Sequence, residues 1–298
     1  MSIYIGVDAG GTKTSVIVAD GDRIIARATG GPGAVRAGRA LPAASRIAVA
    51  VREALTSVRL LQGDTMVVGA AGVGRDPERG ELRDALRIER VATKTVVTGD
   101  LDIALEAAHG QGPGIVLVSG TGSVAVSRDK DGELHRAGGY GWQMGDEGSG
   151  YSIARGALLA IGRGQDSRGP ATTLLLAILA AGPAKSFDEL VRWTNAAEPR
   201  EIAALAPAVF DAASQGDAVA QGLMEAAADE LVALVTPLLA GFGAKGTIPL
   251  ALSGGHLAPG RPLRGPVETR LKRERRLALL ETPLDPAEGA LALARRAT

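Results

Sequence analysis

Residues 3–20 read IYIGVDAGGTKTSVIVAD, and this stretch decides the architecture of the first part of the chain. Residues 3–7 and 15–19 are short runs of apolar and β-branched residues, a composition typical of strands. Residues 8–14 between them hold a Gly-Gly pair, which favours a tight turn. A further glycine turn leads into residues 23–28, so the sequence predicts three strands joined by two turns.

The same pattern recurs at residues 114–128, which read GIVLVSGTGSVAVSR. Apolar runs at residues 114–119 and 124–128 flank a second Gly/Thr turn, and the Asp-Gly pair at residues 131–132 predicts another hairpin. We interpret the recurrence as an internal repeat, and therefore expect two related α/β lobes.

The remaining segments alternate between helical and strand patterns. Helical spacing of apolar residues predicts helices at residues 41–58, 78–86, 103–108 and over much of 151–239, and short apolar runs predict strands at residues 65–70, 94–97 and 249–253. We place the first lobe at residues 1–105 and the second, with a helical insert, at residues 106–298. A final helix is predicted at residues 286–296, and it is able to pack back on the first lobe.

The composition excludes several classes of function. The 298 residues carry 33 Lys and Arg against 33 Asp and Glu, so no basic field is present to hold nucleic acid or an anionic membrane. The chain has no Cys, which excludes disulfides, thiolate zinc sites and Cys-ligated iron–sulfur clusters. Neither a signal peptide nor an apolar stretch of the ~20 residues that span a bilayer is visible, so we expect a cytoplasmic protein.

The first glycine turn is a candidate phosphate-binding site. Glycines allow backbone N–H groups to approach phosphate oxygens, and hydroxyl and ammonium groups add donors. The candidate residues are Gly10, Gly11, Thr12, Lys13 and Thr14. Asp8, at the end of the preceding strand, is able to hold Mg²⁺ through water. The alternative is an ordinary glycine-rich turn, because a single Gly-Gly-Thr is a weak signal and the Walker A ending is missing.

The second turn contains Gly120, Thr121, Gly122 and Ser123. Its alternative is again a plain hairpin turn. Two such turns, each opening a lobe, are the layout of the sugar kinase/heat-shock/actin ATPase superfamily. On that layout we expect Thr12 and Thr121 to donate to the phosphates of ATP from opposite lobes.

Five segments together carry a resemblance to a known family. They are residues 7–14 (VDAGGTKT), 119–123 (SGTGS), 138–149 (GGYGWQMGDEGS), 253–255 (SGG) and 288–290 (EGA). With them the chain resembles the BadF/BadG/BcrA/BcrD ATPase family, whose members include N-acetylglucosamine kinases. The resemblance implies an α/β fold of two actin-like (ribonuclease H-like) lobes with mixed sheets around an ATP cleft.

Asp100 is the candidate general base. It follows the strand predicted at residues 94–97, and phosphoryl transfer to a hydroxyl needs a carboxylate that orients the hydroxyl and accepts its proton. In the resembling kinases the Asp at this place is that base. Asp102 is the alternative, although it falls where a helix N-cap is expected. Asp100 itself has a second interpretation as a helix cap.

Residues 138–149 form a glycine-rich loop before a helix predicted to start near Tyr151. The resemblance places Gly139, Tyr140, Gly141 and Asp146 around the sugar. We assign Ser123 to the same substrate group. A carboxylate such as that of Asp146 accepts hydrogen bonds from two neighbouring hydroxyls; the alternative is compensation of the helix dipole.

Two further segments bear on ligand binding. Gly254 and Gly255 follow the strand predicted at residues 249–253, and we expect adenosine to lie against their backbone, with a bare turn as the alternative. The N-acetylglucosamine kinases carry an Asn in the loop after the third strand, where it holds the sugar. Here residues 30–36 read GGPGAVR, so Ala34 or Val35 stands in its place. Arg36 is close enough to reach the same pocket, where it would pair with an acidic substituent on the sugar; the alternative is an ordinary solvated surface residue.

The sequence therefore predicts an ATP-dependent kinase that uses Mg²⁺ and phosphorylates a hydroxyl of an amino sugar of the N-acetylglucosamine, glucosamine or N-acetylmuramic acid type. We expect a small-molecule sugar as its partner and a homodimer as its assembly. The alternative is a non-sugar ATPase of the same family that acts as an activator or regulator. The iron–sulfur version of that alternative is disfavoured because the chain has no Cys.

Overall fold

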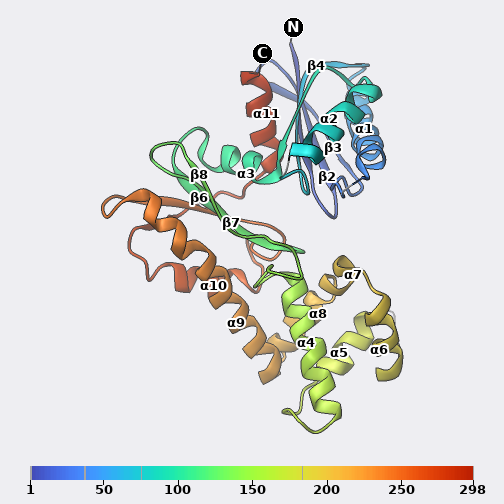
Figure 1. The fold of residues 1–298 in the computed structure, drawn as a ribbon, viewed down its shortest axis with the longest axis vertical. Coiled ribbons are helices and arrows are strands. Elements are labelled where there is room, and N and C mark those ends of the chain that lie inside the picture. Colours follow the sequence, from blue (N-terminus) through green and yellow to red (C-terminus); the bar gives the residue numbers. More distant parts are fainter. Residues whose placement is uncertain (1, 37, 75, 183, 298) are drawn as a thin grey trace. The chain divides into compact units, whose positions relative to one another are not determined.

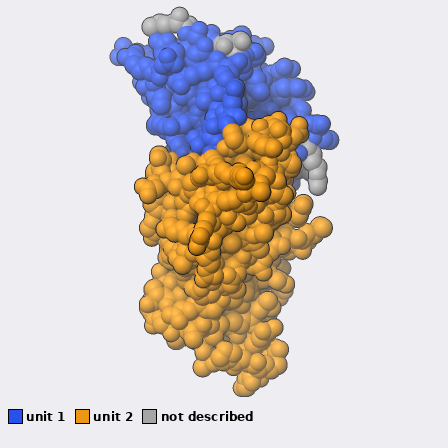
Figure 2. Space-filling model, turned by 90° about the vertical axis from the view of Figure 1, so that its left-hand side faces the viewer, with its two compact units in different colours: residues 1–112, 284–298 blue, residues 113–283 orange. Residues whose placement is uncertain are grey.

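The computed structural model describes residues 2–36, 38–74, 76–182 and 184–297. The chain divides into two compact units, coloured separately in Figure 2. Unit 1 comprises Met1–Gly112 and Leu284–Thr298, and unit 2 comprises Pro113–Pro283. The sequence predicts a division after residue 105, with residues 286–296 counted in the second lobe as a helix able to pack back on the first. The observed first unit is instead discontinuous in sequence.

Unit 1 contains a five-stranded mixed sheet in the order β3-β2-β1-β4-β5. The strands are β1 (Ile3–Ala9), β2 (Thr14–Asp20), β3 (Arg23–Gly30), β4 (Gly63–Ala70) and β5 (Ala92–Gly99). The first three pair antiparallel as consecutive hairpins, whereas β4 and β5 add in parallel beside β1. The carboxyl ends of β1, β4 and β5 therefore share one edge, where parallel sheets of this kind bind ligands.

Helices cover both faces of this sheet (Figure 1). They are α1 (Ala40–Ser57), α2 (Asp76–Glu89), α3 (Asp100–His109) and α11 (Pro286–Arg296). On one face Ile47 of α1 and Leu82 of α2 are buried in the same core as Val7. On the other face α11 packs on β1 and α3, so the last helix of the chain completes unit 1.

Two glycines allow the close approach of α11. A Cβ atom added at Gly6 in β1 would lie 2.8 Å from the Cα of Leu291, and one added at Gly289 would lie 2.7 Å from the backbone nitrogen of Ala107. Real Cβ atoms do not approach backbone so closely. Gly289, in the EGA segment at residues 288–290, therefore has a packing role.

Unit 2 repeats the sheet of unit 1 in the order β10-β9-β6-β7-β8. Its strands are β6 (Gly114–Ser119), β7 (Ser123–Arg128), β8 (Leu134–Gly138), β9 (Ile248–Ser253) and β10 (Leu277–Leu279). Antiparallel hairpins join β6, β7 and β8, and β9 and β10 add in parallel. The predicted repeat of two mixed α/β sheets is confirmed.

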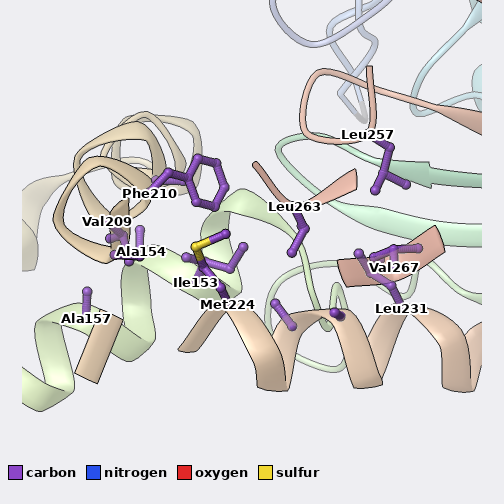
Figure 3. Packing of buried hydrophobic residues seen from close by; sticks show 14 of the residues in the cluster. Ile153, Ala154, Ala157, Val209, Phe210, Met224, Leu231, Leu257, Leu263 and Val267 are labelled. Atoms are coloured by element: carbon purple, nitrogen blue, oxygen red, sulfur yellow. The ribbon is translucent and has the colours of Figure 1, made fainter. Parts of the chain in front are cut away.

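Helices form the rest of unit 2. They are α4 (Gly150–Gln165), α5 (Leu174–Ala181), α6 (Phe187–Ala196), α7 (Pro199–Ala203), α8 (Ala206–Ser214), α9 (Ala218–Val235), the 3₁₀-helix η1 (Thr236–Phe242) and α10 (Arg264–Leu271). Figure 3 shows Ile153 of α4, Phe210 of α8 and Met224 of α9 in their shared apolar core. Across the described residues, no helix combines the length and the apolar character needed to cross a membrane.

Candidate active site

The turn between β1 and β2 presents an exposed stretch of backbone at the edge of the sheet of unit 1. The Gly10 N–H donates to the carbonyl of Lys13 at 2.9 Å and closes the turn. Gly11, Thr12 and Lys13 are exposed. Thr14 is fully buried, and its hydroxyl donates to the carbonyl of Gly31 at 2.7 Å. Thr14 therefore supports the turn, while the three exposed residues remain accessible to a ligand.

Asp8 brings a poorly compensated negative charge to this edge. The pKa of Asp8 is raised from an ordinary 3.8 to about 6, chiefly by burial and then by the nearby carboxylate of Asp100; Lys13 lowers it and Asp285 adds a smaller increase. The folded protein therefore binds a proton here more tightly than the unfolded chain. A cation beside Asp8 would relieve the same penalty.

We expect Asp8→Asn to stabilise the ligand-free protein at pH 8. The folded pKa of Asp8, about 6, exceeds the unfolded value of 3.8, so stability falls as pH rises from 4 to 6. At about 1.4 kcal/mol for each pKa unit, ionised Asp8 costs at most about 3 kcal/mol above pH 6. Urea unfolding followed by circular dichroism should show a gain at pH 8 that largely disappears at pH 4. An equal gain at both pH values would contradict the burial of this charge.

Asp100 directly follows β5, as expected, whereas Asp102 does not occupy the expected N-cap position. The helix α3 begins at Asp100, not near residue 103, and the prediction that Asp102 is its N-cap is wrong. Asp102 lies in the first turn, where its Oδ2 accepts from the Gly99 N–H at 2.9 Å and from the Thr98 hydroxyl. Asp100 Oδ1 accepts from the Leu101 N–H at 3.1 Å. Asp102 is therefore used in capping, and Asp100 is the carboxylate whose charge acts on Asp8.

The loop after β3 is held against the phosphate-turn candidate. The Ala34 N–H donates to the carbonyl of Gly10 at 3.1 Å, and the Val35 N–H donates to that of Ala71 at 2.9 Å. The side chain of Val35 is buried in the core of unit 1, whereas Arg36 is exposed. Arg36 therefore combines exposure with a charged side chain and directly follows the residues whose N–H groups make these contacts.

In unit 2 the turn between β6 and β7 is joined to the glycine-rich loop before α4. The Gly120 N–H donates to the carbonyl of Gly122 at 2.9 Å and closes the turn. The buried Ser119 hydroxyl donates to the carbonyl of Gly148 at 3.0 Å, and the Ser123 hydroxyl donates to that of Glu147 at 2.5 Å. The structure thus brings together Gly120, Gly122 and Ser123 with the loop predicted to bind sugar, and Thr121 lies between them.

Asp146 has an unusual backbone. Its φ of 61° lies in the left-handed region, which Asp tolerates better than most residues. Its Oδ1 accepts from the Ser123 N–H at 3.2 Å. Burial raises the pKa of Asp146; the Ser123 N–H lowers it, the neighbouring Glu147 raises it and Arg136 lowers it. A strained backbone that holds a half-buried carboxylate is typical of a binding site.

The third glycine segment of unit 2 lies against the same turn. Gly254 has a φ of 89°, and a Cβ atom there would lie 2.6 Å from the carbonyl carbon of Ser119. The His256 N–H donates to the carbonyl of Ser119 at 3.1 Å, and the Gly150 N–H donates to that of Gly120 at 2.8 Å. Gly255 is exposed. The predicted phosphate, sugar and adenosine segments of unit 2 are therefore neighbours.

Tyr140, Trp142 and Met144 project from the glycine-rich loop with 67%, 46% and 79% of their surfaces exposed. Gly139 and Gly141 flank Tyr140 with φ values of 68° and 89°. Sequence reasoning missed Arg136, whose guanidinium contacts this loop, because a lone basic residue in a strand carries no distinctive signal.

Direct metal ligation has little support in the described part of the chain. No three His, Asp or Glu side chains there are grouped so as to hold a metal ion. Asp8, at the edge of unit 1, offers a half-buried carboxylate of raised pKa beside an exposed turn. Asp8 and the exposed turn therefore fit a cation that is held partly by water and partly by a phosphate ligand.

Comparison with known proteins identifies the family. The family model described as the BadF/BadG/BcrA/BcrD ATPase family matches residues 5–294. An N-acetylmuramic acid/N-acetylglucosamine kinase of Clostridium acetobutylicum is 31% identical over 78% of this chain and 77% of its own length. An N-acetyl-D-glucosamine kinase of Dictyostelium discoideum is 27% identical over 98% and 97%.

A crystal structure from Chromobacterium violaceum, described as that of a candidate N-acetylglucosamine kinase, superposes with a TM-score of 0.85. It is 27% identical, and the match covers 99% of both chains. The residues matched by the family model extend over both mixed sheets and both glycine turns, and this chain belongs to the BadF/BadG/BcrA/BcrD ATPase family.

Proposed function

We propose that this protein is an ATP-dependent kinase that transfers a phosphoryl group to a hydroxyl of an amino sugar. The observation that carries the proposal is the position of Asp100 at the start of α3, beside Asp8 and the exposed glycine turn, while Asp102 makes the capping hydrogen bonds. The curated relatives are kinases of N-acetylglucosamine, N-acetylmuramic acid or glucosamine.

The exposed turn of unit 1 is the proposed phosphate-binding element. Gly11 offers backbone N–H, Thr12 a hydroxyl and Lys13 an ammonium group. Gly120 to Gly122 form the equivalent turn in unit 2. Mg²⁺ bound with ATP would neutralise charge on the phosphate oxygens. Asp8 would hold that ion through water, which removes the repulsion from Asp100 that contributes to its raised pKa.

Asp100 is the proposed general base. Its carboxylate orients the sugar hydroxyl and accepts the proton as that oxygen attacks the terminal phosphorus. Asp146 is the proposed sugar ligand, with one carboxylate oxygen held by the Ser123 N–H. The other oxygen accepts from substrate hydroxyls. Gly139, Tyr140 and Gly141 complete this part of the substrate site, and Gly254 and Gly255 support adenosine.

A coupled assay of ADP release tests the proposal. Glucosamine, N-acetylglucosamine, N-acetylmuramic acid and neutral hexoses would be screened with Mg²⁺ and ATP. We expect turnover that depends on an amino sugar, with a phosphorylated sugar recovered in equal amount to ADP. ATP hydrolysis of the same rate with and without every sugar would overturn the kinase assignment in favour of an activator or regulator.

The exposed Arg36 bears on which amino sugar is used. Arg pairs well with carboxylates, and N-acetylmuramic acid carries one on its lactyl group. We expect Arg36→Ala to lower kcat/KM for N-acetylmuramic acid by about 10-fold and to change that for N-acetylglucosamine by less than about 2-fold. Arg39→Ala, an exposed neighbour, is the control. Equal effects of Arg36→Ala on both sugars would remove Arg36 from substrate selection.

A further inference from the structure

Arg136 is a charged residue of unit 2 that the proposed chemistry does not use. It lies in β8, just before the loop that carries Asp146. Its Nε donates to the carbonyl of Gly138 at 3.0 Å, and its Nη2 donates to that of Gly139. Its guanidinium carbon lies 5.9 Å from the centre of the Tyr140 ring. One side chain thus contacts three successive residues of the loop.

The backbone at this point has a conformation that needs such support. Gly138 and Gly139 both have positive φ, at 72° and 68°. A Cβ atom would meet Leu234 at 2.7 Å in the first case and Val124 at 3.0 Å in the second. Gly138 is the last residue of β8, so the two left-handed residues lie where the strand gives way to the loop. The planar fork of an Arg can donate to both carbonyls at once, which a Lys ammonium cannot do with the same geometry.

The same guanidinium acts electrostatically on Asp146. Two charged groups influence this carboxylate, since Glu147 raises its pKa and Arg136 lowers it. Burial, the largest cause, raises the pKa, and the Ser123 N–H lowers it. Arg136 is therefore the positive charge that opposes protonation of Asp146.

We propose that Arg136 is a positioning residue for sugar binding, which fixes the path of residues 138–140 through its two hydrogen bonds and balances the charge of Asp146. It does so without touching the sugar. This inference rests on the proposed function, because it takes Asp146 as the sugar ligand. It extends that function to a residue that supports the site from the adjoining strand.

Two variants distinguish the hydrogen bonds of Arg136 from its charge. Arg136→Gln removes the charge and the fork, whereas Arg136→Lys keeps the charge and loses the fork. We expect both to raise KM for the sugar by about 10-fold with KM for ATP within about 2-fold of wild type. We expect only Arg136→Gln to shift the acid limb of kcat/KM for the sugar to higher pH, because Asp146 then takes up a proton more readily. Both variants keep Asp100, so we attribute a difference between their pH profiles to Asp146.

Lys130→Gln is the matched control, since Lys130 is an exposed cation in the turn at the other end of the same hairpin. We expect it to behave as wild type. A KM for the sugar within 2-fold of wild type in Arg136→Gln, or equal rises in KM for sugar and ATP, would overturn the inference. Asp146→Asn separates this failure from failure of the proposed function. If Asp146→Asn also leaves the KM for the sugar unchanged, the assignment of Asp146 as sugar ligand is itself wrong.

Discussion

Replacement of Asp100 by Asn is expected to lower kcat by about 10²–10⁴. The amide has the shape of the carboxylate and can still orient a hydroxyl, but it cannot accept the proton of the attacking oxygen. ATP and sugar should bind with affinities within a few-fold of wild type. Rapid-quench or coupled assays give kcat, and isothermal titration gives the two affinities in the variant.

Asp102→Asn is the matched control for this experiment. In the variant the carboxamide oxygen can still accept from the Gly99 N–H, which donates to Asp102 in the wild-type protein. We expect near-normal turnover and a loss of stability of no more than about 1 kcal/mol. If instead Asp102→Asn abolishes turnover and Asp100→Asn does not, the roles of the two carboxylates are reversed.

Gly289→Ala is expected to destabilise unit 1 by about 3 kcal/mol. The added Cβ atom would meet the carbonyl oxygen of Ile103 and the backbone nitrogen of Ala107, neither of which can turn aside as a side chain can. Helix α11 must then move away from α3. Both Trp residues, Trp142 and Trp193, lie in unit 2, so their fluorescence reports on the other unit. Hydrogen exchange of peptides from β1 and α11 should accelerate while Trp fluorescence unfolding changes little.

Gly80→Ala supplies the control within the same unit. Gly80 lies inside α2, and a Cβ atom there has no neighbour within 4 Å. The same change should therefore stabilise the helix by about 0.5–1 kcal/mol. If hydrogen exchange of the β1 and α11 peptides in Gly289→Ala is as slow as in wild type, then α11 does not pack as closely on α3 as these contacts require.

The sheet-forming hairpins were predictable because the information for them is local. An apolar run, a glycine turn and a second apolar run specify a hairpin within about fifteen residues, and the chain contains this pattern twice. The carboxylates of Asp8 and Asp100 were found for a related reason. Asp8 lies near the end of β1 and Asp100 directly follows β5, and the ends of parallel strands meet at one edge of the sheet.

The details that the sequence did not show depend on hydrogen bonds that are defined only once the backbone is folded. Thr14 was expected among the cofactor-binding residues, and in the structure its buried hydroxyl donates to the carbonyl of Gly31, the residue just after β3. Asp102 was expected to begin a helix, but α3 starts earlier because Asp102 accepts from Gly99 within the first turn. Arg136 became noticeable only when the left-handed glycines beside it were placed in space. Sequence patterns do not encode such pairings individually.

The packing of α11 has a consequence for synthesis on the ribosome. The sheet face of unit 1 that carries Ile17 and Val67 is covered by α11, which is translated only after all of residues 113–283. At ~5–20 residues per second the delay is on the order of ten seconds or more. Unit 2 is contiguous and is able to fold during this time, whereas that apolar face of the nascent chain still lacks its cover. This face is therefore where a nascent-chain chaperone would be needed longest.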